Sequence, residues 1–510
     1  MPGTRHSVLG TRHSALGTRL GLVVAALAAG PLAGQAKPAA DPLAGLPQYI
    51  EQVRVGWKIP GVAVGIVRND SLIFARGFGV KVLGQGDSIT PRTLFAIGSN
   101  SKSFTATAAA MLVDDGKLTW NDKVTKWLPG FQLYDQYVTR ELTVRDVLSH
   151  RSGLGRRADA LWYGTDYSRA EILQRIRYLR PNAGFRTEMG YQNIMFLAAG
   201  EVVGRASGAG YDETIRKRIF APLGMTTSNL SPKDLPSQGD VSTPHSIAKG
   251  VVKPIPWRNL DNVAPAGSIN SNIVEMAQYL RMHLGNGTYK GARLITAGNL
   301  NVTKTPHVNT GGVGDSLSHF SGYGLGWVVQ DYRGRRIAWH NGGIDGMLSE
   351  MWTIPEAGLG IVVLTNGSPH SAGPAIVWNI IDRFLLGQPS KDYLAEGLKR
   401  SEAAMAAQAV REKQIEAERA KDSKPSLALG AYAGSYLDDL YGEITFVTSG
   451  DGLEFRWQSS RAPMAHWQYN SFRTALPSGA ETFVTFQIGR DGRVARVDID
   501  GLGSFTPKLK

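Results

Sequence analysis

The chain of 510 residues contains no cysteine. Disulfide bonds, thiol catalysis and cysteine-ligated zinc are therefore excluded. Charged residues make up only 19% of the chain and hydrophobic residues 42%, which is typical of a folded globular protein rather than a disordered one. The formal net charge is +13, but no basic tract and no nucleic-acid recognition motif accompanies it. We therefore expect no nucleic-acid partner, and interpret the charge as a mildly basic surface facing an anionic cell envelope.

Long apolar runs are also missing, apart from one near the start of the chain. The run "LGLVVAALAAGPLAG" follows an arginine-containing stretch without acidic residues, and it is too short to span a membrane comfortably. "GQA" ending at Ala36 offers the small residues that a signal peptidase reads. An uncleaved anchor is the alternative, but small residues and Pro31 dilute the run. The pattern predicts a signal peptide over residues 1–36, cleavage near Ala36, no stable membrane span, and a periplasmic or secreted protein.

Residues 45–387 alternate between strand-like and helix-like runs. "GVAVGIVRND" and "SLIFARGFGV" read as two strands joined by a turn, and "RRIAWHNGG", "MLSEMWTIPEAG" and "LGIVVLTNGS" read as later strands. Helical patterns lie between these groups, as in "NSNIVEMAQYLRMHLGNG", which opens with capping residues. The predicted fold class is α/β (α+β), with an antiparallel sheet flanked by helices and an all-helical insert.

The last part of the chain changes character twice. Residues 388–424 are rich in Ala, Glu, Lys and Arg and predict a charged helical linker. Residues 425–510 contain short alternating runs such as "GEITFVTS", "GLEFRWQ", "TFVTFQIG" and "RVARVDIDG", separated by Gly-containing turns. In the last run, we expect Ala495, Val497 and Ile499 on a buried face. The pattern predicts a small C-terminal antiparallel β-barrel domain, either a passive appendage or an accessory that covers a site or mediates oligomerisation.

Ser99 and Lys102 lie three residues apart in "FAIGSNSKSF", directly before the apolar run "TATAAAML". A lysine beside a serine is ordinary on a solvated helix face, but here the neighbours predict a buried helix. Residues i and i+3 share a face, so the amine can reach the hydroxyl, activate it as a nucleophile and accept its proton. A second pair, Ser246 and Lys249, has no helix behind it, and we interpret it as coincidence.

Seven segments occur in a fixed order along residues 45–387: "FAIGSNSKSFTA", "LTVRDVLSHRSGLG", "GYQN", "PLGMTTS", "VAPAGSINSN", "YGLGW" and "WHNGGIDG". Together they resemble the serine β-lactamase class C and DD-peptidase superfamily, the penicillin-recognising, peptidase S12-like serine hydrolases. This group also includes D-aminopeptidases and carboxylesterases, so the resemblance fixes a mechanism better than a substrate. The C-terminal β domain resembles the lipocalin-like module of some members.

The resemblance implies a role for each matching residue. Ser99 would be the nucleophile, Lys102 its proton acceptor, and Tyr191 the residue that passes a proton to the leaving group. Asn193 would bind the substrate's acyl-side amide. An isolated tyrosine is more often a packed aromatic, but the spacing of Tyr191 before Asn193 and its order after Ser99 favour the functional role. Asn193 could instead be the N-cap of the helix "IMFLAAGEVV", and the two roles are compatible. His150 in "LSHRSGL" is expected to hold its loop rather than touch substrate.

The segment "HNGG" supplies the remaining binding residues, His340, Asn341, Gly342 and Gly343. β-Lactamases of this type usually have Lys-Thr-Gly at the first three positions, whereas peptidase and esterase relatives often have His-x-Gly. His340 would replace a permanent charge by one that titrates near neutral pH. The Gly343 N–H would join that of Ser99 as an oxyanion hole. These departures weaken the case for a dedicated penicillinase.

The sequence therefore predicts an exported serine acyl hydrolase that forms an acyl-enzyme. A peptidase or amidase on small peptides, with D-residues among its substrates, is favoured over a carboxylesterase, and a β-lactamase comes third. A catalytically silent binding protein on the same fold remains the alternative from another class. No zinc motif, glycine-rich nucleotide loop or Gly-x-Ser-x-Gly elbow occurs, so we expect no metal and no cofactor.

Overall fold

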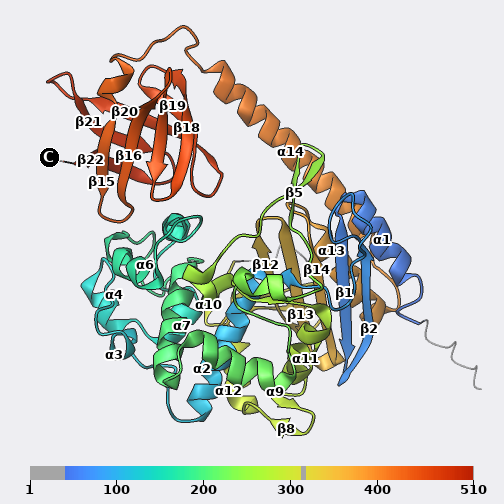
Figure 1. The fold of residues 1–510 in the computed structure, drawn as a ribbon. Coiled ribbons are helices and arrows are strands. Elements are labelled where there is room, and N and C mark those ends of the chain that lie inside the picture. Colours follow the sequence, from blue (N-terminus) through green and yellow to red (C-terminus); the bar gives the residue numbers. More distant parts are fainter. Residues whose placement is uncertain (1–40, 312–316, 509–510) are drawn as a thin grey trace, which may run out of the picture. The chain divides into compact units, whose positions relative to one another are not determined.

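A computed structural model describes residues 41–311 and 317–508 (Figure 1). Within these residues the main sheet has eight strands, all paired antiparallel, in the order β2-β1-β14-β13-β12-β11-β10-β9. Their bounds are β1 (Gly61–Arg68), β2 (Ser71–Gly79), β9 (Val308–Asn309), β10 (Ser321–Tyr323), β11 (Val328–Tyr332), β12 (Arg335–Ile344), β13 (Met347–Ile354) and β14 (Leu359–Thr365). The predicted signal peptide over residues 1–36 lies outside the described residues.

Both faces of this sheet are buried by helices. On β1, Val62, Val64 and Ile66 lie in the core cluster that includes residues of α1 (Leu46–Gly56) and α13 (Ala372–Leu386). Ala63 and Val67 belong to the second cluster, with residues of the helices on the other face. This alternation follows from the two-residue repeat of a strand, and it explains why "GVAVGIV" is apolar at nearly every position.

The helices between β2 and β9 form the body on the second face. The longest are α2 (Ser101–Asp114), α7 (Asn193–Ser207) and α11 (Ile273–Leu284), and α11 packs on β1 and β14. The shorter helices are α3 (Val124–Trp127), α4 (Gln136–Glu141), α5 (Val144–Leu148), α6 (Arg169–Arg175), α8 (Tyr211–Ile215), α9 (Ala221–Leu223), α10 (Ala264–Gly267) and α12 (Ala297–Thr303).

The sequence predicted an all-helical insert, but the insert also contains strands. They form three two-stranded pairs, which are β3 (Phe95–Ala96) with β6 (Asn270–Ser271), β4 (His245–Ala248) with β5 (Val251–Pro254), and β7 (Thr288–Tyr289) with β8 (Ala292–Arg293). These strands have two to four residues each, too few for a two-residue repeat to appear in the sequence. The α/β fold class with an antiparallel sheet and helical layers is confirmed.

The charged segment forms α14 (Tyr393–Ala417), of which only Tyr393 and Gly397 are buried. It leads to a closed barrel whose strands within the described residues are β15 (Gly434–Asp438), β16 (Gly442–Ser449), β17 (Gly452–Trp457), β18 (Ser460–Gln468), β19 (Ser471–Ala475), β20 (Glu481–Ile488), β21 (Val494–Ile499) and β22 (Gly503–Pro507). The predicted β-barrel is confirmed. Val497 and Ile499 are buried as expected, but Ala495 is exposed. Gln487 of β20 pairs with Arg496 and Ile488 pairs with Val494, so Ala495 has no partner and the register shifts there.

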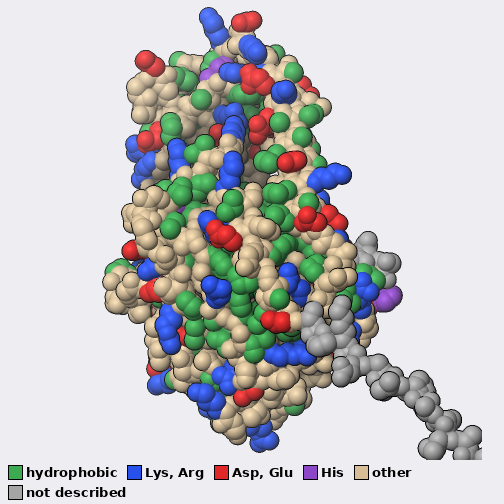
Figure 2. All heavy atoms as spheres, turned by 90° about the vertical axis from the view of Figure 1, so that its right-hand side faces the viewer, with side chains coloured by type: hydrophobic (Ala, Val, Ile, Leu, Met, Phe, Trp, Pro, Cys, Tyr) green, Lys and Arg blue, Asp and Glu red, His purple; other side chains and the backbone are tan. Residues whose placement is uncertain are grey.

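Figure 2 shows one face of the molecule, on which lysine and arginine side chains are dispersed among acidic and apolar ones. In this view the excess positive charge is therefore not gathered into one patch. Across the described residues, none of the helices combines the length and the apolar character needed to cross a lipid bilayer.

Candidate active site

Ser99 lies in a single 3₁₀ turn, Gly98–Asn100, that leads directly into α2. Gly98 has a φ of 49°, and a Cβ on it would come within 2.7 Å of the Gly343 backbone nitrogen. A glycine is therefore required here, both for the left-handed backbone and for the close approach of β12. This approach brings the backbone of Gly343 beside the serine, where the sequence predicted an oxyanion hole.

Lys102 is fully buried, with 0% of its surface exposed. Its Nζ lies 2.9 Å from Ser99 Oγ, 2.7 Å from Asn193 Oδ1 and 2.8 Å from the Ala266 carbonyl oxygen. The two carbonyl oxygens can only accept hydrogen bonds. A neutral amine would donate its two hydrogens to them, and its lone pair would then face the serine hydroxyl.

The electrostatic surroundings of Lys102 favour this neutral form. Burial lowers the pKa of its ammonium well below the usual value, the Asp159 carboxylate partly restores it, and the Arg156 guanidinium lowers it further. Burial dominates because removing an ammonium from water penalises the charged state. Lys102 is thus placed to accept a proton from Ser99.

Tyr191 contacts the same serine from the other side, and its hydroxyl donates to Ser99 Oγ over 2.9 Å. Burial raises the pKa of this phenol, so it stays protonated at neutral pH. The Arg156 guanidinium lies 4.5 Å from the centre of the tyrosine ring. The serine oxygen therefore has a potential base on one side and a potential proton donor on the other.

Asn193 is not the N-cap of its helix. Gln192 holds that position, with its side chain accepting from the Ile194 N–H, and Asn193 is the first helical residue. The Asn193 side chain is freed to accept from Lys102, while its Nδ2 donates to Asp159 Oδ1 over 3.2 Å. The second bond fixes which amide end faces the lysine.

His340 differs from the sequence expectation of a group that titrates near neutral pH. It is 3% exposed, its Nε2 lies 3.0 Å from the Tyr323 hydroxyl, and its Nδ1 lies 2.5 Å from the Asn341 carbonyl oxygen. Burial and the nearby Lys102 lower its pKa to about 3. The ring is therefore neutral throughout the physiological range, and it supplies shape and hydrogen bonds rather than charge.

The strand segment after His340 presents an open edge beside Ser99. His340–Ile344 pairs with β13 on one side, whereas the pairing of β12 with β11 ends at Trp339. In the described part of the chain, no other strand pairs with that second edge. Asn341 and Gly343 are exposed, and Gly342 lies so close to Ile97 that a Cβ would be 1.9 Å from its carbonyl oxygen. The segment is therefore held tightly yet leaves backbone groups accessible.

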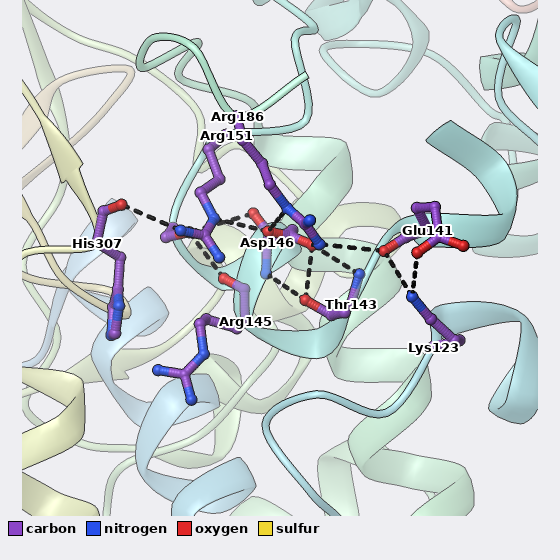
Figure 3. A network of polar contacts seen from close by, with 9 residues as sticks. Lys123, Glu141, Thr143, Arg145, Asp146, Arg151, Arg186 and His307 are labelled. Carbon is purple, nitrogen blue, oxygen red and sulfur yellow. Dashed lines mark hydrogen bonds and ion pairs between the residues drawn. The ribbon is translucent and has the colours of Figure 1, made fainter. Parts of the chain in front are cut away.

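The buried carboxylate of Asp146 forms ion pairs with Arg151 and Arg186 (Figure 3). Asp146 accepts from Arg151 Nε over 2.6 Å and from Arg186 Nη2 over 2.7 Å, and it forms a capping box with Thr143 at the start of α5. Arg151 and Arg186 are 35 positions apart in the sequence, so their shared contact with Asp146 holds the two ends of the segment 152–185 together. Two backbone bonds, from Arg186 N–H to the Arg151 carbonyl and from Gly190 N–H to the His150 carbonyl, continue this alignment up to Tyr191.

His150 holds this loop, as the sequence predicted. It is fully buried, and its Nδ1 accepts from the Gln192 N–H over 3.1 Å. Its ring centre lies 4.3 Å from that of Tyr191. The His150 imidazole thus packs against the Tyr191 ring and holds the backbone of the next residue, Gln192.

These groups open into a cavity of about 750 Å³. Its wall includes Arg156 and Asp159, and on another side Asp345, which is held by Arg258 at 2.7 Å and by the Tyr163 hydroxyl. Asp345 lies in the segment "WHNGGIDG". The other four residues belong to none of the seven segments, and they reach the site only through tertiary folding. Among the described residues, no group of three or more metal-binding side chains occurs.

The barrel contacts the segment that lines this cavity. The Tyr441 hydroxyl donates to the Arg157 carbonyl over 2.8 Å, and the Tyr167 hydroxyl donates to the Tyr441 carbonyl over 2.7 Å. Arg157 lies in the same 3₁₀ helix, Arg156–Leu161, as Asp159. The contacts therefore link the barrel to the backbone that carries two cavity residues.

The helix-flanked antiparallel sheet and its clustered Ser, Lys and Tyr define the beta-lactamase-fold class of serine hydrolases. Residues 48–382 match the family model described as Beta-lactamase, so the chain belongs to that family. Residues 418–509 match a model described as a domain of unknown function, DUF3471. The predicted membership of the serine β-lactamase and DD-peptidase-like superfamily is confirmed.

Three relatives illustrate the range of the similarity. The chain is 30% identical over 434 residues to the Unguisins hydrolase ungD' of Aspergillus campestris, covering 78% of this chain and 77% of that protein. An octameric penicillin-binding protein homologue from Pyrococcus abyssi superposes with a TM-score of 0.62 at 22% identity, covering 91% of this chain and 99% of the other. A D-stereospecific amidohydrolase from Streptomyces sp. gives 0.54 at 22% identity, with 68% and 99% covered. The last two likenesses concern the fold.

Proposed function

We propose that the protein is an exported serine acyl hydrolase that works through an acyl-enzyme intermediate and cleaves amide bonds in small peptides, including peptides with D-residues. The observation that carries this proposal is the Ser99 hydroxyl, which lies 2.9 Å from both the Lys102 amine and the Tyr191 hydroxyl. A nucleophile with a base and an acid at hydrogen-bond distance is the arrangement that acyl transfer needs.

In the first step, Ser99 Oγ attacks the substrate carbonyl carbon as its proton moves to the Lys102 amine. The carbonyl oxygen becomes an oxyanion, stabilised by the backbone N–H groups of Ser99 and Gly343. Asn193 and Ala266 keep the two amine hydrogens of Lys102 engaged, so its lone pair remains directed at the serine.

In the second step, the tetrahedral intermediate collapses and the bond to the leaving group breaks. Tyr191 gives its proton to the departing nitrogen and is reprotonated from Lys102, leaving Ser99 as an ester. Water then attacks this ester by the same route in reverse, which releases the acid and restores the serine. An amide's nitrogen must gain a proton before it leaves, whereas the alkoxide of an ester depends less on a proton donor. Tyr191 is protonated and can supply this proton, which supports an amidase over an esterase.

The open edge of His340–Ile344 supports a peptide substrate. An extended peptide can add to such an edge through main-chain hydrogen bonds and place its carbonyl at Ser99. The relative named Unguisins hydrolase also supports a hydrolase, and the neighbour named a D-stereospecific amidohydrolase supports amides and D-residues as its substrates. β-Lactamases of this type usually have a lysine where this chain has the neutral His340, so the fixed positive charge is missing. We therefore rank β-lactam hydrolysis below amide and ester hydrolysis.

The proposal is tested by covalent labelling. Incubation of the protein with a fluorophosphonate should add one label per chain in the intact mass, and Ser99→Ala should remain unlabelled. Ser246→Ala, which removes the serine of the second Ser-x-x-Lys pair, is the matched control and should label like the wild type. Equal labelling of Ser99→Ala and wild type would defeat the assignment. Absence of both labelling and turnover with any probe would favour the silent binding protein.

Substrate class is tested with a panel of D- and L-amino-acid amides, nitrophenyl butyrate and nitrocefin. An amidase should give its highest kcat/KM on an amide, and faster turnover of D- than of L-amides would support D-residue selectivity. A highest value on nitrophenyl butyrate or nitrocefin would instead assign an esterase or a β-lactamase.

We further propose that residues 1–36 are a cleaved signal peptide, that residues 45–387 form the hydrolase domain, and that residues 388–424 link it to an accessory domain over 425–510. The hydrogen bonds from Tyr441 and Tyr167 support a barrel that influences the cavity. A chain ending at Gly387 should still cleave a small ester but change its ranking of peptides, and light scattering of the same chain tests an assembly role. An unchanged ranking and particle size would support a passive appendage.

A further inference from the structure

A second cavity, of about 240 Å³, lies apart from the one at Ser99 and shares none of its lining residues. It is bounded by α11, α12, the start of β12 and the 3₁₀ turn after β13. The lining residues are His283, Asn286, Ala297, Leu300, Asn301, Lys304, Arg336 and Pro355. Three of these carry basic side chains, and no carboxylate is among the lining residues in the part of the chain that the structure describes.

Lys304 is the most unusual of them. It directly follows α12, and only 3% of its surface is exposed. Within residues 41–311 and 317–508, no hydrogen bond or ion pair is found for its ammonium, which lies 5.3 Å from the centre of the Trp327 ring. Burial, assisted by Arg336, lowers its pKa to about 7. A buried cation without a partner is costly, so an occupant that pairs with it would be strongly favoured.

Two further side chains in the cavity wall have buried nitrogens without a hydrogen-bond partner among the described residues. His283 is 1% exposed, and neither of its ring nitrogens has a hydrogen-bond partner among the described residues. The Nε of Arg336 is likewise buried and unpartnered, although its Nη1 donates to Asn301 Oδ1 over 2.9 Å. Buried donors of this kind are nearly always satisfied in folded proteins, by protein, water or ligand.

We propose that this cavity is a binding site for a tetrahedral oxyanion, such as phosphate or sulfate. Lys304 and Arg336 supply positive charge from two sides, and His283 supplies a ring N–H. The exposed Asn286 and Asn301 lie at the cavity wall and offer amide donors. A tetrahedral anion has acceptor oxygens pointing in four directions, which matches donors that come from separate elements. The volume accommodates such an ion with a few waters.

The site differs in kind from the catalytic cavity. None of its lining residues is a serine or threonine, and none of them contacts Ser99, Lys102 or Tyr191. It still lies on the same scaffold, because Arg336 and His340 belong to one strand, β12. An occupant would therefore stabilise the fold around the strand that flanks Ser99 without entering the reaction.

Binding is tested by titrating inorganic phosphate into the full-length protein in a calorimeter at pH 6.5 and constant ionic strength. The wild type should bind about one phosphate per chain. Lys304→Met, which keeps the side-chain length and removes the charge, should weaken binding at least tenfold. Lys249→Met, which removes an exposed lysine, is the matched control and should bind like the wild type. This control also separates specific binding from the general stabilising effect of phosphate on proteins.

Further arms define the ligand and protect the test against misfolding. Arg336→Gln changes a partly exposed residue and should also weaken phosphate binding. It serves as the test variant if Lys304→Met does not fold. Sulfate should compete with phosphate, and chloride should compete far less. If glycerol phosphate binds as tightly as phosphate, the natural ligand is a phosphate group on a larger molecule. If glycerol phosphate binds much more weakly, the natural ligand is the free ion. No saturable heat with wild type, equal binding by Lys304→Met, or equal competition by chloride would overturn the proposal.

Discussion

Lys102 and Lys304 are both buried and both have a lowered pKa, yet their surroundings are opposite. Lys102 has three oxygen neighbours within 2.9 Å, arranged so that a neutral amine is fully satisfied. Lys304 lies in the wall of a cavity with the Trp327 ring beside its ammonium, and among the described residues no hydrogen bond or ion pair is found for it. The first environment directs a lone pair at a hydroxyl, whereas the second directs an ammonium into empty volume.

The comparison teaches that a lowered pKa alone does not define a catalytic lysine. What separates the two sites is the identity of the neighbours: acceptor oxygens and a nucleophile at Lys102, unpartnered donors at Lys304. Desolvation affects both in the same direction. Chemistry follows from the hydrogen bonds that each side chain can make once its charge state is set.

The largest expected difference is in catalysis. Lys102→Met should lower kcat/KM on the best amide substrate by about 10⁴-fold, because Ser99 then lacks a base. Lys304→Met should stay within a few-fold of the wild type on the same substrate, since no atom of Lys304 reaches the catalytic cavity. Steady-state kinetics on both variants decides the matter. Comparable losses in the two variants would show that the sites are not separate.

The next largest effect is the pH dependence of stability. With its folded pKa at about 7 and an unfolded pKa near 10.5, Lys304 binds more protons in the unfolded chain between these values. Stability should therefore rise with pH through this window, and the penalty of the buried charge is fully present below pH 7. In phosphate-free buffer, the free energy of unfolding of the wild type relative to Lys304→Met should increase by about 2 kcal/mol from pH 7 to pH 9.

Urea denaturation at several pH values measures this difference. Phosphate should flatten the slope, because an anion beside Lys304 favours its charged form. Burial holds the pKa of His283 well below its usual value, so this side chain stays neutral across the range, and the difference between the wild type and Lys304→Met belongs to Lys304. A wild-type curve parallel to that of Lys304→Met would contradict the assignment.

A smaller effect is expected at Asp159, which acts on Lys102 through Asn193. Asp159→Asn keeps an oxygen that can accept from Asn193 but removes the charge that raises the Lys102 pKa. The kcat should fall about tenfold, because the new amide can also turn its NH₂ group toward Asn193, whose orientation is then no longer fixed. Because activity requires neutral Lys102, the acidic limb of the pH–rate profile should move to lower pH. The exposed Asp87→Asn is the control, and a fall in kcat without a shifted limb would indicate a merely structural role.

The smallest effect is expected for the second Ser-x-x-Lys pair, Ser246 and Lys249, which is a negative control for Ser99 and Lys102. Ser246 lies on β4 and Lys249 is exposed in the following turn, with no helix to align them. The double variant Ser246→Ala with Lys249→Met should retain activity within twofold, and its stability should lie within about 0.5 kcal/mol of the wild type. A large loss of activity would show that the sequence pattern misidentified the nucleophile.

Local patterns predicted those parts of the fold that depend on local rules. The hairpin at Asn69 and the cap at Asn272 were both predictable, because a turn residue and a capping side chain act on their immediate neighbours. The barrel strand β18 was not recognised. Its sequence "SRAPMAHWQ" includes Pro463 and a histidine, which obscure the alternation of a strand.

The predicted catalytic residues lie together, because each belongs to a segment of the motif series. Asp159 and Arg156 had no such signal, since their contribution depends on where the 3₁₀ helix Arg156–Leu161 packs. Ala266 lies in the segment "VAPAGSINSN", but the sequence does not indicate that its carbonyl oxygen would accept from Lys102. The neutral state of His340 was also beyond the sequence. It follows from burial against Lys102 and Tyr323, which no local pattern records.

Strand β12 constrains how this lineage can change. Its ten residues carry Arg336 toward one end and Asn341–Gly343 toward the other. Because side chains alternate along a strand, inserting or deleting one residue between these ends would turn one set to the opposite side of the sheet. Point substitutions can therefore accumulate within β12 over descent, whereas gains and losses of length should be confined to the tight turn at Arg333 and Gly334.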